Sequence, residues 1–362
     1  MPHRRRDFEM TDISFDRSRY LPSAVVDRGP ALVAGGALLI GLLVIAQLID
    51  LRQAALFVVG GLLGVALYHG SFGFTGGWRR MVVERRGRGI RAQMLMIGVA
   101  ALAMIPLISA GSLGGQPLVG ALIGSAHLPW WLTLPSFGTI DLGRQLGTGT
   151  AILATLAGLG LVALATALIE RRAHGNIERE PEPSRPGWTW LLYGPWPLVG
   201  AGLLMALLNV ATLLLAGHPW SVTFGFGLWG AKAAQAVGVP VATWEFWNWP
   251  GPQAALSASV LADVTSVMNF GIVLGAAAAA SLAGKFAPKA KIPLGSMLAA
   301  VVGGLLMGYG ARLSFGCNIG ALFSGIASGS LHGWLWFATA FVGSFVGIWM
   351  RPLFGLDGFK KK

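Results

Sequence analysis

The stretch ARLSFGCNIGALFSGIASGSLHGWLW, residues 311–336, is mainly apolar, yet glycine interrupts it at positions 316, 320, 325, 329 and 333. It contains Cys317, the single cysteine in a chain of 362 residues. A helix interrupted so often is too short to cross a bilayer, and backbone that leaves a helix at membrane depth needs partners in protein or in a water-filled cavity. The stretch therefore predicts a short re-entrant segment beside a polar path.

The whole chain has the composition of a polytopic membrane protein. Hydrophobic residues make up 54% of it and charged residues 12%, about half the charge of an average soluble domain. The mean hydropathy is +0.64. Runs able to cross, or nearly cross, a hydrocarbon layer of ~30 Å lie at about 31–49, 54–70, 93–111, 150–168, 190–215, 254–282, 294–311 and 333–350. The sequence therefore predicts an all-α, multi-pass membrane protein with eight or nine spans.

The basic residues favour one orientation of these spans. The formal net charge is +12, and most of it falls in loops within 4–6, 79–91, 171–185, 285–291 and 360–362. The positive-inside rule places these loops and both termini in the cytoplasm, so the charge indicates a lipid bilayer as partner and not nucleic acid. The linkers at 112–148 and 216–252 then lie on the far side. Their tryptophans favour an aromatic belt at the lipid headgroups, with ligand stacking as the alternative.

The polar, proline-containing stretch RRAHGNIEREPEPSRPG divides the chain into two halves of similar size. It predicts the following organisation: a cytoplasmic N-terminal segment at 1–30, a first transmembrane half at 31–170, a cytoplasmic linker at 171–187, a second transmembrane half at 188–355 and a basic cytoplasmic tail at 356–362.

The two halves share a motif. GSFGFTGGWRR, residues 70–80, follows one apolar run and VTFGFGLWGAK, residues 222–232, follows another. On the predicted orientation the two copies lie at opposite faces of the membrane. This is the pattern of an inverted repeat, which many transporters use to build a substrate site near the midplane. The copies contribute Phe72, Phe74, Phe224 and Phe226 as possible pathway residues.

The glycine-rich breaks favour an anion path, with helix packing as the alternative. The free N–H groups and positive end of a broken helix are natural anion ligands, and Cys317, Asn318 and Ser324 add side-chain donors. Alternatively, Gly320, Ser324 and Ser328, at spacing four, form a small-residue ridge that lets two helices touch. A lone buried cysteine is also often an inert, small apolar residue.

Three further polar residues lie in or beside apolar runs. Arg312 either reaches the membrane surface or helps to attract an anion. Asp263 and Asn269 are intramembrane candidates for the pathway, although Asp263 also fits a helix end. The chain has no cluster with zinc-like spacing, no phosphate-binding loop and no nucleophile–base pair, so we expect no metal, no cofactor and no enzyme activity.

The stretch GARLSFGCNIGALFSGIASGSLHGWLW resembles the YeeE/YedE family of bacterial inner-membrane proteins, the sulphur-transport family, whose characterised activity is thiosulfate uptake. The segments SFGFTGGWRRMVVERRGRGIRAQMLM, GSLGGQPLVGA and HLPWWLTLPSFG also look like family sequence, so the resemblance covers most of residues 60 to 350. It implies an hourglass-shaped helical protein with inverted halves, short re-entrant helices and a constriction lined by cysteines. In the family, these thiols are thought to pass thiosulfate along by hydrogen bonds.

By this resemblance we expect Cys317 to face the substrate. The other expected substrate-binding residues are Gly316, Asn318, Arg312 and Ser324. Family members typically carry a second break of the form Gly-Gly-Gly-Cys in the first half. Here only LIGSA separates Ala121 from His127, so the first half lacks that segment, through divergence or through a deletion.

The leading hypothesis is therefore an inner-membrane transporter that takes up thiosulfate or a related small sulphur anion through a Cys-lined constriction. The alternative is a non-transporting accessory or scaffold protein in sulphur or selenium metabolism, which hands a species to a cytoplasmic sulfur-carrier protein. The missing first-half cysteine favours the alternative.

Overall fold

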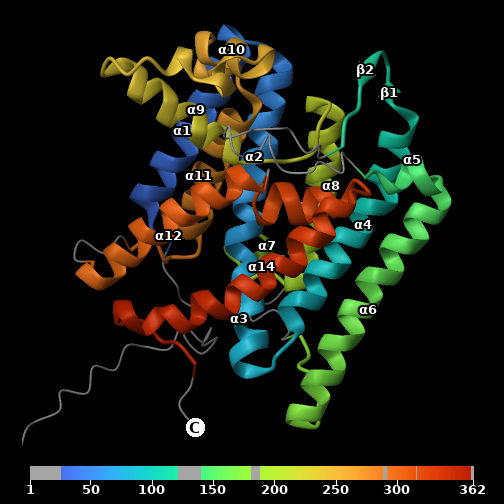
Figure 1. The fold of residues 1–362 in the computed structure, drawn as a ribbon. Coiled ribbons are helices and arrows are strands. Elements are labelled where there is room, and N and C mark those ends of the chain that lie inside the picture. The colour runs from blue at the N-terminus through green and yellow to red at the C-terminus, as the bar shows by residue number, and fades with distance from the viewer. Residues whose placement is uncertain (1–25, 121–139, 181–187, 288–291, 315, 360–362) are drawn as a thin grey trace, which may run out of the picture.

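The computed structural model describes residues 26–120, 140–180, 188–287, 292–314 and 316–359. Several predictions fall wholly or partly outside these ranges: the N-terminal segment, the gap after Ala121, the Trp130 and Trp131 belt, and the basic tail. Within them the chain is helical, and the only strands are the two-residue pair β1 (Ser112–Leu113) and β2 (Gln116–Pro117). The all-α fold class is confirmed (Figure 1).

Eight helices in the described ranges are long and apolar enough to cross a membrane, as the hydropathy pattern predicts. The long helices are α1 (Arg28–Leu48), α2 (Leu51–His69), α4 (Arg88–Ala110), α6 (Thr148–His174), α8 (Leu198–Ala216), α11 (Val264–Leu282), α12 (Leu294–Leu313) and α14 (Leu331–Met350).

Shorter elements join them. The α-helices are α3 (Phe74–Glu84), α5 (Leu142–Leu146), α7 (Thr189–Tyr193), α9 (Thr223–Ala236), α10 (Pro250–Ser257) and α13 (Gly325–Ala327). The 3-10 turns are η3 (Val241–Thr243), η4 (Glu245–Asn248), η5 (Val260–Ala262) and η7 (Arg351–Phe354), and η6 (Asn318–Ser324) is a π-helix.

Helices α2 and α11 cross with their backbones in contact. A Cβ atom added at Gly64 would lie 2.1 Å from the carbonyl oxygen of Ile272, and one at Gly275 would lie 2.0 Å from that of Gly61. Each helix carries glycines four residues apart, at 60 and 64 and at 271 and 275. This spacing keeps one side of a helix bare and lets two helices approach closely in lipid. Among the described elements, this pair has the most extensive contact.

Helix packing agrees with the pairing that an inverted repeat requires. Helix α2 packs on α11, and α4 packs on α8. The first Phe-Gly-Phe motif follows α2 and opens α3, and the second follows α8 and opens α9. If α2 corresponds to α8 and α4 to α11, the contact between α2 and α11 corresponds to the contact between α8 and α4. The inverted repeat nevertheless stays a prediction.

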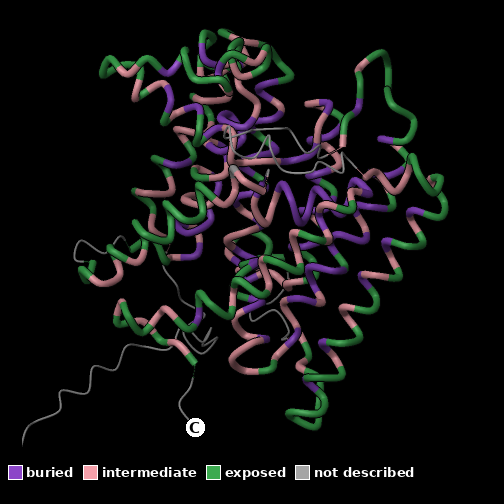
Figure 2. Tube along the Cα trace, in the orientation of Figure 1, coloured by how far each residue is buried: buried purple, intermediate pink, exposed green. Residues whose placement is uncertain are grey.

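The outer helices expose apolar side chains. None of the apolar window of α12 is buried, compared with 61% of the α4 window. Figure 2 shows the same contrast, with exposed residues along the outer helices and buried residues around the centre. Apolar surface of this extent suits contact with lipid chains. Helix α12 therefore forms part of the lipid-facing surface, while α4 belongs to the core.

Candidate functional site

The predicted break around Cys317 is a short helix between two long ones. Residues Asn318–Ala327 form an apolar helix, made of η6 and α13, between α12 and α14. The carbonyl of Cys317 accepts from the N–H of Ala321 at 2.9 Å and of Leu322 at 3.3 Å. A π-helix is rare and often marks a functional site.

The turn before η6 requires glycine. Gly316 has a φ of +156°, and a Cβ atom there would lie 2.7 Å from the backbone nitrogen of Ala321. A side chain at this position would strain the backbone and clash with η6. The turn therefore fixes where the next residue, Cys317, presents its thiol.

Cys317 and Asn318 begin η6 with open polar groups. The Cys317 sulfur accepts from the N–H of Ile319 at 3.5 Å, and the thiol is free and half-buried. Within the described ranges, the half-buried Asn318 amide has no hydrogen-bond partner. The side chain of Arg312 lies outside what the structure describes. A substrate contact by any of these three stays a prediction.

Ser324, in contrast, makes hydrogen bonds to other protein groups. Its side chain is 1% exposed, and its hydroxyl donates to the carbonyl of Trp220 at 2.7 Å. The Asn209 amide nitrogen donates to the Ser324 hydroxyl at 3.2 Å, and the Asn209 amide oxygen accepts from the backbone N–H of Trp220 at 2.8 Å. Ser324 therefore ties η6 to α8 and to the turn before α9. Its role in substrate binding stays a prediction.

The first Phe-Gly-Phe motif reaches the Cys317 region. Phe72 lies edge-on to Phe74 at 5.6 Å between ring centroids, and Phe74 lies 6.5 Å from Phe323 of η6. All three side chains are buried. Two of the predicted pathway phenylalanines thus line the same aromatic cluster as η6.

The second motif lies in a different cluster. Phe224 contacts the rings of Phe246 and Trp247 at 6.5 and 6.3 Å. Phe226 is 57% exposed and lies beside Trp229. The structure therefore does not bring Phe224 and Phe226 to η6, and their place on a pathway stays a prediction.

Asp263 and Asn269 both make structural contacts. Asp263 caps the N-terminus of α11, because its carboxylate accepts from the N–H of Ser266 and the hydroxyl of Thr265, each at 2.7 Å. Asn269 is 3% exposed and donates to the carbonyl of Val222 at 3.0 Å. The geometry thus matches the helix-end interpretation of Asp263, and Asn269 holds the start of α9 against α11.

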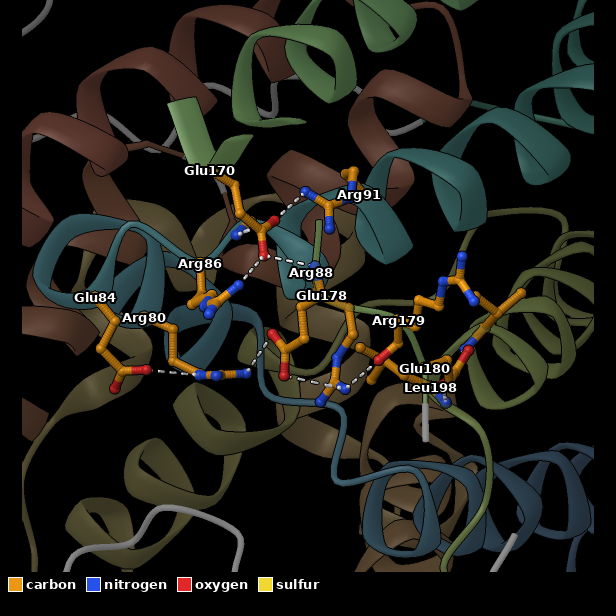
Figure 3. A network of polar contacts seen from close by, with 12 residues as sticks. Arg80, Glu84, Arg86, Arg88, Arg91, Glu170, Glu178, Arg179, Glu180 and Leu198 are labelled. Carbon is orange, nitrogen blue, oxygen red and sulfur yellow. Dashed lines mark hydrogen bonds and ion pairs between the residues drawn. The ribbon is translucent and has the colours of Figure 1, made fainter. Parts of the chain in front are cut away.

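Sequence reasoning missed a buried carboxylate, Glu170, near the end of α6. Its side chain is fully buried and accepts from Arg91 at 2.6 Å and from Arg86 at 3.2 Å. The backbone N–H groups of Gly87 and Glu178 donate to it at 3.2 and 2.9 Å. Figure 3 shows these groups converging on one carboxylate. We call this arrangement the Glu170 clasp.

The clasp holds part of the predicted linker. Glu178 pairs with Arg80 and Arg88, each at 3.3 Å, and Glu180 accepts from the N–H of Leu198 at the start of α8. Residues 175–180 are therefore fastened to the α3–α4 turn and to α8. The available signal was a single glutamate at the end of an apolar run, in a chain with an arginine-rich loop at 79–91.

Comparison with known proteins gives one family and several relatives. The family model described as Sulphur transport matches residues 69–118 and 115–346. The probable transporter YedE of Escherichia coli K12 is 31% identical over 155 residues, which cover 42% of this chain and 37% of that protein. The YedE of Salmonella typhimurium is 32% identical over 164 residues, with 44% and 38% covered. This chain thus spans less than two fifths of either YedE.

A further relative matches at greater length. The thiosulfate transporter TsuA of Escherichia coli K12 is 26% identical over 338 residues, which cover 81% of this chain and 93% of that protein. No solved structure matches the chain.

Proposed function

This chain belongs to the sulphur transport family, and we propose that it is a transporter that carries thiosulfate or a related small sulphur oxyanion into the cell across the bacterial inner membrane. Eight apolar helices in the described ranges make it a multi-pass membrane protein. Membership of a transport family bears out the expectation that it is not an enzyme. On this proposal both termini are cytoplasmic, as the basic loops indicate.

The observation that carries the proposal is the thiol of Cys317 at the start of η6. The Gly316 turn fixes its position, and the Asn318 amide beside it has no partner among the described residues. A thiol is a weak donor that holds a polarisable sulfur atom loosely. Conduction requires loose binding, because the ion must also leave. A single thiol with a neighbouring amide therefore suits passage of a sulphur oxyanion.

The name of one relative supports thiosulfate as the substrate. TsuA of Escherichia coli is named a thiosulfate transporter, and the alignment covers 93% of it. The alignment with TsuA is 338 positions long, but the 81% of this 362-residue chain that it covers contains fewer residues than that. TsuA therefore has residues at some aligned positions where this chain has none.

Uptake of labelled thiosulfate tests the proposal, in cells that lack other importers. We expect uptake with the wild type and loss of it with Cys317→Ala at equal protein level. A membrane-permeant maleimide should block the wild type by alkylating its only thiol. Protection of the wild type by excess unlabelled thiosulfate during treatment is the matched control, because a nonspecific effect of the reagent would not be reduced by the substrate. Equal uptake by wild type and Cys317→Ala would remove the thiol from the mechanism.

The second candidate is a non-transporting accessory protein that passes a sulphur species to a cytoplasmic carrier protein. The missing first-half cysteine segment favours it, because a relay of several thiols cannot form with one. A chimera that restores a Gly-rich cysteine loop after Ala121 separates the two. If only the chimera transports thiosulfate, the natural chain has the accessory role. Transport by both excludes it.

A further inference from the structure

Trp220 has a buried indole N–H that donates a hydrogen bond to no group in the described ranges. Its side chain is 0% exposed, and its indole N–H has no hydrogen-bond partner. Other tryptophans of the chain are paired: the indole of Trp78 donates to Gln93 at 2.9 Å, and that of Trp229 donates to Ser266 at 2.8 Å. An unmet buried donor costs free energy, and buried indole groups normally find an acceptor. The position therefore calls for an acceptor that comes from elsewhere.

The surrounding groups hold Trp220 firmly in place. Its backbone N–H donates to Asn209 of α8 at 2.8 Å, and its carbonyl accepts from Ser324 of η6 at 2.7 Å. Its ring lies edge-on to Phe323, with 6.3 Å between centroids and planes at 88°. The backbone of Trp220 is thus held from two elements and its ring packs on η6, while the indole N–H takes part in none of these contacts. A group fixed so closely with its donor free is a preorganised ligand.

The free donor lies beside the segment that Cys317 begins. Ser221, the next residue, approaches η6 so closely that a Cβ atom at Gly320 would lie 3.4 Å from its hydroxyl oxygen. The Ser324 contact lies one helical turn further along. The turn that carries Trp220 therefore packs along η6, in which the thiol of Cys317 is the N-terminal cap.

We propose that the indole N–H of Trp220 donates a hydrogen bond to the sulphur oxyanion as it passes η6. This inference rests on the proposed function and adds a second ligand, carried by the turn before α9 that packs on η6. An indole nitrogen donates and does not accept, so it favours oxyanions over cations and carries no charge that would trap a divalent anion. Trp220 is on this account an affinity-determining residue of the anion site.

The test compares Trp220→Phe with Trp78→Phe, since each keeps a ring and removes one buried indole N–H. Loss of one neutral hydrogen bond should raise the KM for thiosulfate uptake by about three- to tenfold in Trp220→Phe. Both variants lose ring volume at a buried site, which lowers the melting temperature. Trp220→Phe should melt at a higher temperature than Trp78→Phe without anion, because it loses no hydrogen bond, while the shift in its melting temperature produced by thiosulfate should shrink. Trp78→Phe leaves Gln93 without its donor, so it should melt earlier and keep the wild-type KM.

The indole N–H signals of 15N-labelled protein read the contact directly. Thiosulfate should shift the signal that disappears in Trp220→Phe and should leave that of Trp78 in place. An unshifted signal together with a wild-type KM in Trp220→Phe overturns the inference, and so does a melting temperature without anion that falls as far in Trp220→Phe as in Trp78→Phe. If the wild type neither takes up thiosulfate nor is stabilised by it, the proposed function fails together with the inference. A transporting wild type with an unaffected Trp220→Phe overturns the inference alone.

Discussion

At the Glu170 clasp and at the η6 segment, a connecting segment packs against the long helices. The two regions differ in whether their polar groups have hydrogen-bond partners. In the clasp, one carboxylate accepts from two arginines and two backbone N–H groups (Figure 3). At η6, the Asn318 amide has no partner within the described ranges, and the Trp220 indole likewise has none. A closed network holds structure together, whereas preorganised open donors are suited to a ligand.

Breaking the closed network should have the largest effect on stability. Glu170→Ala removes a buried carboxylate and leaves Arg86 and Arg91 without it, which should lower the free energy of unfolding by about 3–5 kcal/mol. Thermal unfolding in detergent measures the loss. Glu84→Ala is the matched control, because the Glu84–Arg80 pair is partly exposed and such pairs contribute only about 0–1 kcal/mol. Equal stability of the two variants would show that the clasp is not structural.

Breaking the support of η6 should have the next largest effect. Asn209→Ala removes the groups that hold Trp220 and Ser324, and unmet buried polar groups cost about 1–3 kcal/mol. Thiosulfate uptake should fall with stability, since η6 loses its anchor. Thr212→Val is the control, because the buried Thr212 hydroxyl donates only to Leu208 of its own helix. If Asn209→Ala unfolds as the wild type does, the anchor assignment is wrong.

Straining the turn before Cys317 should cost about as much as losing the Asn209 contacts. Gly316→Ala forces a side chain onto a φ of +156° and against Ala321, at about 1–3 kcal/mol for the strained backbone. Gly320→Ala should show no such loss, since its Cβ atom would meet the Ser221 hydroxyl only at 3.4 Å. Thermal unfolding and thiosulfate uptake, measured on Gly316→Ala and Gly320→Ala, compare the two glycines directly. A larger loss from Gly320→Ala would favour the helix-packing alternative for this segment.

The sequence predicted the large features because they follow from hydropathy. Eight apolar runs became eight helices, and the break around Cys317 became a short helix between α12 and α14. Both depend on local composition, which a lipid environment selects strongly.

Contacts between segments that lie far apart in the chain were harder to predict from the sequence. The sequence left open whether the glycines of η6 serve close packing, but the closest helix crossing lies between α2 and α11. The arginines of 79–91 were interpreted as loop charge, and their partner Glu170 lies far along the chain. Asp263 and Ser324 were grouped with the anion path, although both bind protein groups here. A residue type indicates that a side chain can donate or accept a hydrogen bond, but only the fold shows which group is its partner.

The most direct test of the account is the accumulation of labelled thiosulfate in liposomes that contain the purified protein, compared between wild type and Cys317→Ala. The half-buried thiol contributes little to packing, so we expect the two proteins to unfold at about the same temperature. We predict that the wild type accumulates thiosulfate and that accumulation with Cys317→Ala falls to the level of empty liposomes. Equal accumulation by the two proteins, or none by the wild type, would contradict it.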